Sequence, residues 1–167
     1  FSQQFGYGYY SSGKLNPYKY IHCYINIPDN CSRDSLFQSE VRRCKSFLDI
    51  IDNNPNSRHF CVFDELYSGT NPYEAISSAY SYLNYISKNK IIKFILTTHY
   101  IKLCKLFRKH KNIKNLNMKT KTINNNAQYY YKIIKGISKI KGGIAILKNL
   151  EYPEPVVKKA IEIMNKL

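Results

Sequence analysis

The chain has 167 residues, which is enough for about one domain with a single sizeable core and too few for several. Hydrophobic residues make up 44% of it, and no run approaches the roughly 18 apolar residues that a membrane span requires. These values exclude a membrane-spanning protein, and no signal peptide is indicated. Because the chain begins with Phe1 rather than Met, we expect a fragment of a longer protein.

The formal charge of +15 fits two interpretations. Lysine and arginine neutralise phosphates, so an excess of basic residues favours binding to a nucleic acid. Lysine outnumbers arginine 21 to 5, however, and Ile, Asn and Tyr are abundant, which is the bias of AT-rich coding sequence. Such lysines would simply cover solvated faces, and this second interpretation is favoured for the basic stretch from Lys102 to Lys121.

The five cysteines show neither a Cys-x-x-Cys spacing nor an even count. This pattern favours neither disulfide bonds nor a zinc site. We therefore expect a reducing intracellular compartment, either the cytoplasm or the nucleus.

The first half of the chain alternates strand and helix patterns. Residues 1–20 are rich in Gly, Ser and aromatic residues and favour a loop, and residues 20–27 favour a short strand. Residues 35–51 have the spacing of an amphipathic helix capped by Asp34 or Ser35. Its apolar positions include Val41, whereas Glu40 is grouped with the polar residues between them.

A strand, helix and strand follow, and they predict a parallel unit. Phe60 to Phe63 is an apolar run that stops at two acids, as a buried parallel strand does at the carboxyl edge of a sheet. Pro72 opens a helix that runs to about Ser87, and residues 91–98 form a second buried strand. The connection between such strands is expected to be right-handed.

The last third favours smaller elements. A helix is predicted over residues 100–110, and a hairpin over 116–123 and 128–134 with its turn at 124–126. Two more helices follow Gly142-Gly143 and Pro153.

Asp64 and Glu65 follow a buried strand, and adjacent acids in this place suit an ATPase of the P-loop class. The first acid holds the water shell of Mg²⁺, and the second polarises the attacking water. Acids also follow strands as helix caps, so the pair alone is a weak signal.

The neighbouring segments strengthen that signal. Residues 64–75 are Asp-Glu-Leu-Tyr-Ser-Gly-Thr-Asn-Pro-Tyr-Glu-Ala, residues 97–100 are Thr-Thr-His-Tyr, and residues 35–41 are Ser-Leu-Phe-Gln-Ser-Glu-Val. In order and spacing they resemble the Asp-Glu-Leu-Gly-Arg-Gly-Thr, Thr-His-Tyr and Ser-Thr-Phe-x-x-Glu-Met motifs of the MutS family of ABC ATPases. With weaker similarities further along, the resemblance covers about residues 3–164.

The resemblance implies an α/β fold: a partial P-loop (ABC-type) nucleotide-binding domain with a parallel-rich sheet flanked by helices. This domain would occupy residues 1–138, and a small helical dimerisation element would occupy residues 139–167. The parent protein would be an ATPase that binds mismatched or branched DNA and acts as a homo- or heterodimer. ATP and Mg²⁺ would be its cofactors.

The resemblance also implies roles for individual residues. Asp64 would hold Mg²⁺ through water, Glu65 would act as the general base, and His99 would contact the γ-phosphate side and the catalytic water. Ser35 would reach the nucleotide of the other subunit, with the helix N-terminus beside it favouring phosphate oxygens. The remaining nucleotide-binding candidates are Gly69, Thr70 and Gln4.

The chain departs from the family pattern in two respects. Tyr67-Ser68 replaces Gly-Arg, a version similar to MutS-like proteins of large DNA viruses, which would add a viral factory to the possible locations. The sequence also contains no Gly-x-x-x-x-Gly-Lys-Ser/Thr loop to cradle phosphates. We therefore expect this chain alone to be inactive as an ATPase.

Two alternatives remain open. Another ABC ATPase of DNA maintenance would need a Leu-Ser-Gly-Gly-like signature, which Ser35-Leu36-Phe37 does not match. A non-catalytic module would keep the fold for dimerisation or interaction alone.

Overall fold

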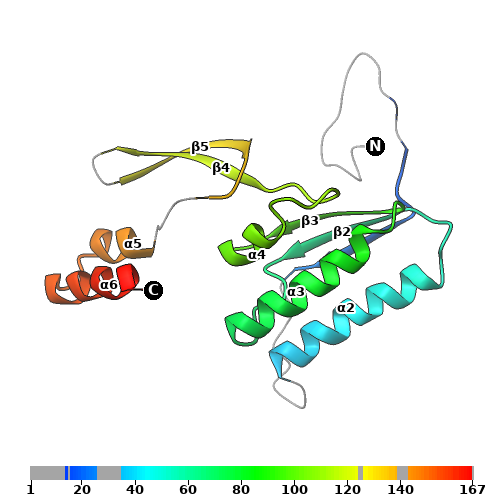
Figure 1. The fold of residues 1–167 in the computed structure, drawn as a ribbon, viewed down its shortest axis with the longest axis horizontal. Helices are drawn as coiled ribbons and strands as arrows, with labels where there is room; N and C mark the ends of the chain where they lie inside the picture. Colours follow the sequence, from blue (N-terminus) through cyan, green and yellow to red (C-terminus); the bar gives the residue numbers. More distant parts are fainter. Residues whose placement is uncertain (1–13, 15, 26–34, 124–125, 139–142, 167) are drawn as a thin grey trace. The chain divides into compact units, whose positions relative to one another are not determined.

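The computed structural model describes residues 14, 16–25, 35–123, 126–138 and 143–166 (Figure 1). The chain divides into two compact units between Ile113 and Lys114. In chain order, the elements are β1 (Tyr20–Tyr24), α2 (Leu36–Asp52), β2 (His59–Asp64), α3 (Pro72–Ser87), β3 (Ile92–Thr97), α4 (Ile101–Leu106), β4 (Leu116–Ile123), β5 (Asn126–Lys135), α5 (Gly143–Asn149) and α6 (Glu154–Lys166).

The first unit contains a three-stranded parallel sheet with strand order β1-β2-β3. The parallel strand, helix, strand unit predicted for residues 60–98 is therefore confirmed, and β1 with α2 adds a second such unit. Helices α2 and α3 run side by side along one face of this sheet (Figure 1). When two successive strand-helix-strand connections have the same handedness and add each new strand on the same side of the sheet, their helices lie on the same face.

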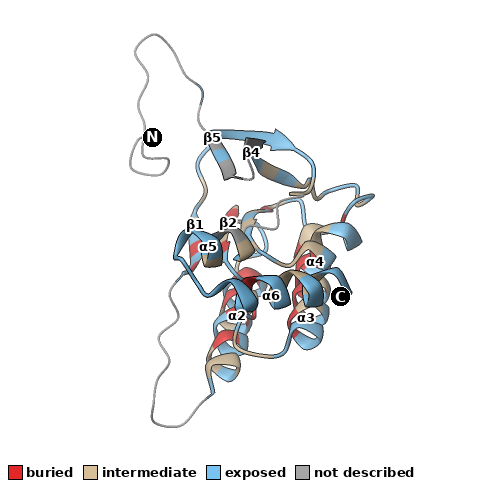
Figure 2. Cartoon of the chain, turned by 90° about the vertical axis from the view of Figure 1, so that its left-hand side faces the viewer, coloured by how far each residue is buried: buried red, intermediate tan, exposed pale blue. Residues whose placement is uncertain are grey.

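Helix α2 begins at a capping box. The Ser35 hydroxyl accepts a hydrogen bond from the Gln38 backbone N–H, and the Gln38 side chain accepts one from the Ser35 N–H. Its buried side follows four residues spaced four, three and four apart, seen as a stripe in Figure 2. These residues are Glu40, Cys44, Phe47 and Ile51. Val41, expected on the apolar side, is 41% exposed, so that expectation was wrong.

Helix α3 has the bounds that the sequence predicted. The Asn71 side chain accepts hydrogen bonds from the N–H groups of Tyr73 and Glu74, and Pro72 supplies a φ angle suited to the first turn. Ala75 and Ala79 are 0% exposed, because their small side chains let the helix lie close to its neighbours.

Phe63 lies at the centre of the core. Its ring centroid is 6.2 Å from that of Phe47 on α2, 5.8 Å from that of Tyr82 on α3 and 6.3 Å from that of Phe94 on β3. Burying one such side chain contributes about 1.5–3 kcal/mol. The core therefore fixes β2 at the residue before Asp64.

The opposite face of the sheet carries exposed apolar side chains. Cys23, Val62 and Ile95 are neighbours across the three strands, and Ile95 is 57% exposed. Ile21 on β1 and Ile25, the residue after its end, are also about half exposed. Parallel sheets are ordinarily covered on both faces, so this exposure is unusual.

Two predicted elements are longer than the observed ones. The strand predicted to begin at residue 20 ends at Tyr24, and the helix predicted to reach residue 110 ends at Leu106. The chain turns at Phe107, whose ring is 3% exposed and stacks on Tyr80 at 4.8 Å. The spacing of apolar residues along this helix could not predict the turn, because the turn places Phe107 against Tyr80, which lies on another helix.

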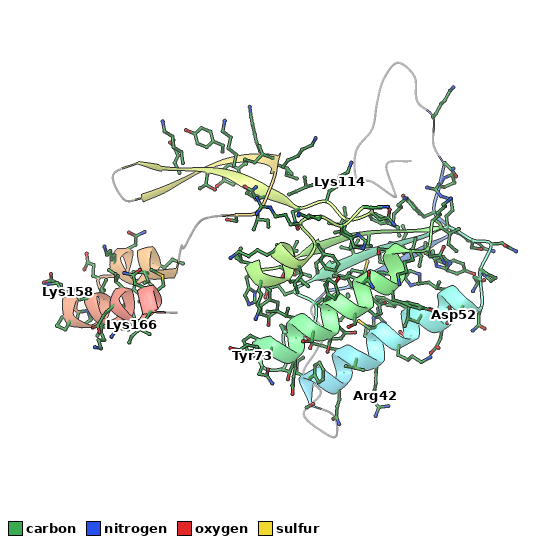
Figure 3. The ribbon with its side chains drawn as sticks, in the orientation of Figure 1. Arg42, Asp52, Tyr73, Lys114, Lys158 and Lys166 are labelled. Carbon is green, nitrogen blue, oxygen red and sulfur yellow. The ribbon has the colours of Figure 1, made fainter. Side chains whose placement is uncertain are left out.

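The second unit contains a hairpin and two helices. Strands β4 and β5 are antiparallel, as predicted, with a register irregularity between Met118 and Thr120. Helices α5 and α6 are also as predicted, and the lysines of α6 extend into solvent beside acids of the same helix (Figure 3). The predicted domain boundary after residue 138 stays a prediction.

Among the described residues, no helix has both the length and the apolar content to cross a membrane.

Candidate functional site

The carboxyl ends of β2 and β3 bring the predicted chemical residues together. The Thr97 hydroxyl donates a hydrogen bond to the Asp64 carboxylate, and the Glu65 N–H donates one to the Thr97 carbonyl oxygen at 3.0 Å. These bonds extend the pairing of β2 with β3 by one residue. Asp64 and Glu65 are both exposed at this edge of the sheet.

His99 faces Glu65 across this edge. Its Nδ1 lies 3.1 Å from Glu65 Oε1, with the two side chains 59% and 51% exposed. Glu65 has a φ angle of 51°, in the left-handed region that costs a residue with a Cβ roughly 1–2 kcal/mol. The turn directs Leu66 into the core, where it is 1% exposed, while the Glu65 carboxylate stays at the surface.

The donor set at this edge suits one side of a magnesium site. An exposed carboxylate is a ligand that Mg²⁺ prefers, and Mg²⁺ usually keeps several waters and takes its other ligands from phosphates. Among the described residues, no group of three or more His, Cys, Asp or Glu side chains is arranged so that it could hold a metal ion by itself. Asp64 fits the predicted role, whereas a phosphate cradle is missing from the sequence.

The loop after Glu65 enters the core at Tyr67. This residue is 5% exposed and has a φ angle of 61°, and its N–H donates a hydrogen bond to the Tyr24 hydroxyl at 3.2 Å. Its ring lies edge-on to those of Phe37 and Tyr82, at 5.8 and 6.4 Å. Burial raises the pKa of Tyr67, so its hydroxyl stays neutral.

Glu40 is a functional candidate that the sequence analysis missed. It was grouped with the polar residues of its helix, but it is only 2% exposed. Its carboxylate accepts three hydrogen bonds of 3.0 Å, from the N–H and hydroxyl of Ser68 and from the N–H of Gly69. Its spacing from Cys44, Phe47 and Ile51 places it on the buried stripe, and this was the signal in the sequence.

Gly69 lies against the first turn of α2. A Cβ at this position would be 2.8 Å from both Leu36 Cγ and the Phe37 backbone nitrogen, closer than real Cβ atoms come. Glycine is therefore required by the close approach of the loop to the helix. The next residue, Thr70, donates a hydrogen bond from its hydroxyl to Glu74 on α3.

Ser35 is exposed at the start of the same helix, where its hydroxyl takes part in the cap. The structure therefore groups the predicted residues in two places. Asp64, Glu65 and His99 lie at the sheet edge, while Gly69 lies against the helix turn that Ser35 caps. Gln4 and Asp34 lie outside the described residues.

Comparison with known proteins identifies the family of the chain. The family model of MutS domain V matches residues 7–167. The chain belongs to the MutS domain V family. The resemblance inferred from the motifs is confirmed, and so is a mixed α/β fold with a parallel sheet.

Three bacterial relatives are each named DNA mismatch repair protein MutS. The protein of Parabacteroides distasonis is 34% identical over 146 residues, covering 86% of this chain and 16% of the relative. That of Clostridium kluyveri is 33% identical over 83% of this chain and 16% of its own length. That of Aquifex pyrophilus is 32% identical over 80% of this chain and 15% of its own length.

This MutS domain V chain thus spans about one sixth of the length of these relatives. Nucleotide binding, hydrolysis, dimerisation and DNA binding stay predictions for it. The placement near proteins of large DNA viruses is also still a prediction.

Proposed function

We propose that this MutS domain V chain supplies the water-activating and metal-holding part of an ATPase site in a longer DNA mismatch or branched-DNA binding protein. The observation that carries the proposal is the cluster of Asp64, Glu65 and His99 at the ends of two adjacent parallel strands. Ligands of open parallel sheets bind at the carboxyl ends of the strands, which supports this edge as the site.

Each residue of the cluster has a role that its position supports. Asp64, oriented by the Thr97 hydroxyl, would hold Mg²⁺ through water, and the bound ion would neutralise phosphate charge. Glu65 would accept a proton from the attacking water or orient it, because its carboxylate is exposed and lies beside a second polar group. His99 would keep the Glu65 carboxylate in one direction and donate toward the phosphate side.

The other half of the site would come from elsewhere in the protein. A phosphate-binding loop would lie outside these 167 residues, since their sequence contains none. Ser35 would contact the nucleotide of a second subunit, because its hydroxyl stands exposed beside the N-terminus of a 17-residue helix. DNA binding would be carried mainly by parts of the protein beyond this chain.

The central test is Glu65→Ala in the complete protein. Hydrolysis should slow by roughly 10² or more, the scale expected when a positioned proton acceptor is lost, while ATP binding is kept. Single-turnover hydrolysis and equilibrium binding of ATP give the two quantities. An unchanged hydrolysis rate would contradict the assignment of Glu65.

The matched control is Asp52→Ala, which removes the same charge from the C-terminal end of α2, seven residues before β2 begins (Figure 3). This variant should hydrolyse ATP at the parental rate. The 167-residue chain alone should show no turnover. If the complete protein binds no ATP, the non-catalytic interaction module becomes the better assignment.

A further inference from the structure

Glu65 and the loop that follows it, residues 66–70, donate backbone hydrogen bonds to acceptors on neighbouring elements. The N–H of Glu65 bonds to the Thr97 carbonyl, and that of Tyr67 bonds to the Tyr24 hydroxyl. The next two N–H groups, of Ser68 and Gly69, bond to the two carboxylate oxygens of Glu40. The loop is therefore held from β3, from β1 and from α2.

A carboxylate is suited to the place that Glu40 occupies. A buried charge is costly unless hydrogen bonds replace its lost water, and charge-assisted bonds are stronger than neutral ones. Three donors from the loop point at Glu40. Because the bonds are made by the loop, removing the carboxylate would release the loop rather than the helix.

Gly69 makes a second connection to the same helix. It lies so close to Leu36 and Phe37 that it leaves no room for a Cβ, so a shift of the first turn of α2 would push the loop directly. The cap of that turn is Ser35. Glu65 directly precedes this loop in the chain.

We propose that Glu40 is a positioning residue that locks the loop of residues 66–70 to the first turns of α2 and thereby sets the direction of the Glu65 carboxylate. This inference rests on the proposed function, since Glu65 is taken as the group that activates water. The lock also joins the helix turn that Ser35 caps to the loop that directly follows Glu65. A nucleotide held at Ser35 would thus be sensed at Glu65 through Glu40.

The test is Glu40→Gln, which keeps the size of the side chain. Its single carboxamide oxygen can still serve Ser68, but its NH₂ group would face the Gly69 N–H, so one half-buried donor loses its acceptor. In the 167-residue chain, we expect the Gly69 amide to exchange with solvent at least about tenfold faster. In the complete protein, we expect kcat to fall about 10²-fold with KM within about threefold, because a small misplacement of a catalytic group has this effect.

Asp49→Asn is the matched control. It removes the same charge from the same helix, where Asp49 is exposed and paired with Lys45. It should change neither the exchange of the Gly69 amide nor kcat. If Glu40→Gln does not fold, Ser68→Ala takes its place, removing one donor to Glu40 while leaving the backbone intact. This variant should also speed the exchange of the Ser68 and Gly69 amides and lower kcat by about threefold or more.

Unchanged amide exchange in Glu40→Gln, or in Ser68→Ala if only that variant folds, would overturn the proposal. So would a loss confined to KM. The two proposals fail separately: if Glu65→Ala hydrolyses ATP at the parental rate, the assignment of Glu65 is wrong, whereas amide exchange still reports whether Glu40 locks the loop.

Discussion

Nδ1 of His99 lies 3.1 Å from Oε1 of Glu65, and the two residues come from neighbouring strand ends. If His99 orients this carboxylate, His99→Ala should lower kcat by about 10²-fold while ATP binding is retained. Rapid-quench hydrolysis measurements would check this. A variant that loses ATP affinity but keeps its rate would show that His99 serves binding and not the chemical step.

Ser35 caps α2, and we propose that it also contacts a nucleotide; substitution can separate these two roles. Ser35→Ala removes the hydroxyl that caps α2 and should destabilise the chain by about 0.5–2 kcal/mol. Ser35→Asn keeps a capping oxygen and should leave the urea midpoint almost unchanged. Both variants should lower hydrolysis in the complete protein, and only when subunits are associated. Full activity of Ser35→Asn would leave Ser35 with the cap alone.

Gly69→Ala should destabilise the chain by about 1–3 kcal/mol, the usual range for overpacking. The reason is that its Cβ would meet a backbone nitrogen and a side-chain carbon of α2 at 2.8 Å. Gly143→Ala is the control, because a Cβ there meets nothing within 4 Å. Urea denaturation would compare the two. Equal midpoints would mean that the loop can move away from the helix.

The buried position of His22 predicts that the free energy of unfolding decreases in acid. Its ring nitrogen lies 3.0 Å from that of His59, and burial, then the neighbouring His59, then Arg43 lower the pKa of His22. In the unfolded chain the pKa of this histidine is about 6.5, higher than in the folded chain. The unfolded chain therefore binds a proton at a higher pH than the folded chain does. The free energy of unfolding should therefore be fully retained above this pH and decrease as the pH falls below it. In His22→Gln this decrease should be smaller, and an identical pH profile would argue against His22 as its source.

The exposed face of the sheet predicts the reactivity of cysteines. Cys23 is exposed there, whereas Cys44 and Cys61 are buried, which raises the pKa of each thiol to about 12. Cys104 is of intermediate burial, so both it and Cys31 are first replaced by serine. In this background, a thiol reagent should label Cys23 quickly and label Cys44 and Cys61 only on unfolding. Adding Cys23→Ser should abolish the fast phase. A fast phase that persists would place another thiol at the surface.

Local patterns predicted much of this structure. Asn71 and Pro72 give α3 a start that depends only on neighbouring residues, and the apolar run of β2 predicted where Asp64 and Glu65 emerge. The family resemblance assigned both Glu65 and His99 to the catalytic water, and the structure brings these two side chains to neighbouring strand ends.

The features that were not predicted depend on contacts between distant segments. Periodicity can place Glu40 on a helix face, but it cannot show that the N–H groups of Ser68 and Gly69 will meet it there. The pairing of His22 with His59 likewise requires the register of β1 on β2.

Tyr67 has a consequence for how this loop can change over time. The resembling motif has glycine at this position, and a glycine takes a φ angle of 61° without strain. A tyrosine here bears a backbone cost of roughly 1–2 kcal/mol, which burial of its ring offsets by about 1.5–3 kcal/mol. Because Phe37 and Tyr82 pack around that ring, a glycine at this position would leave a void. Exchanging Tyr67 for the glycine of the resembling motif would therefore require compensating changes in its neighbours.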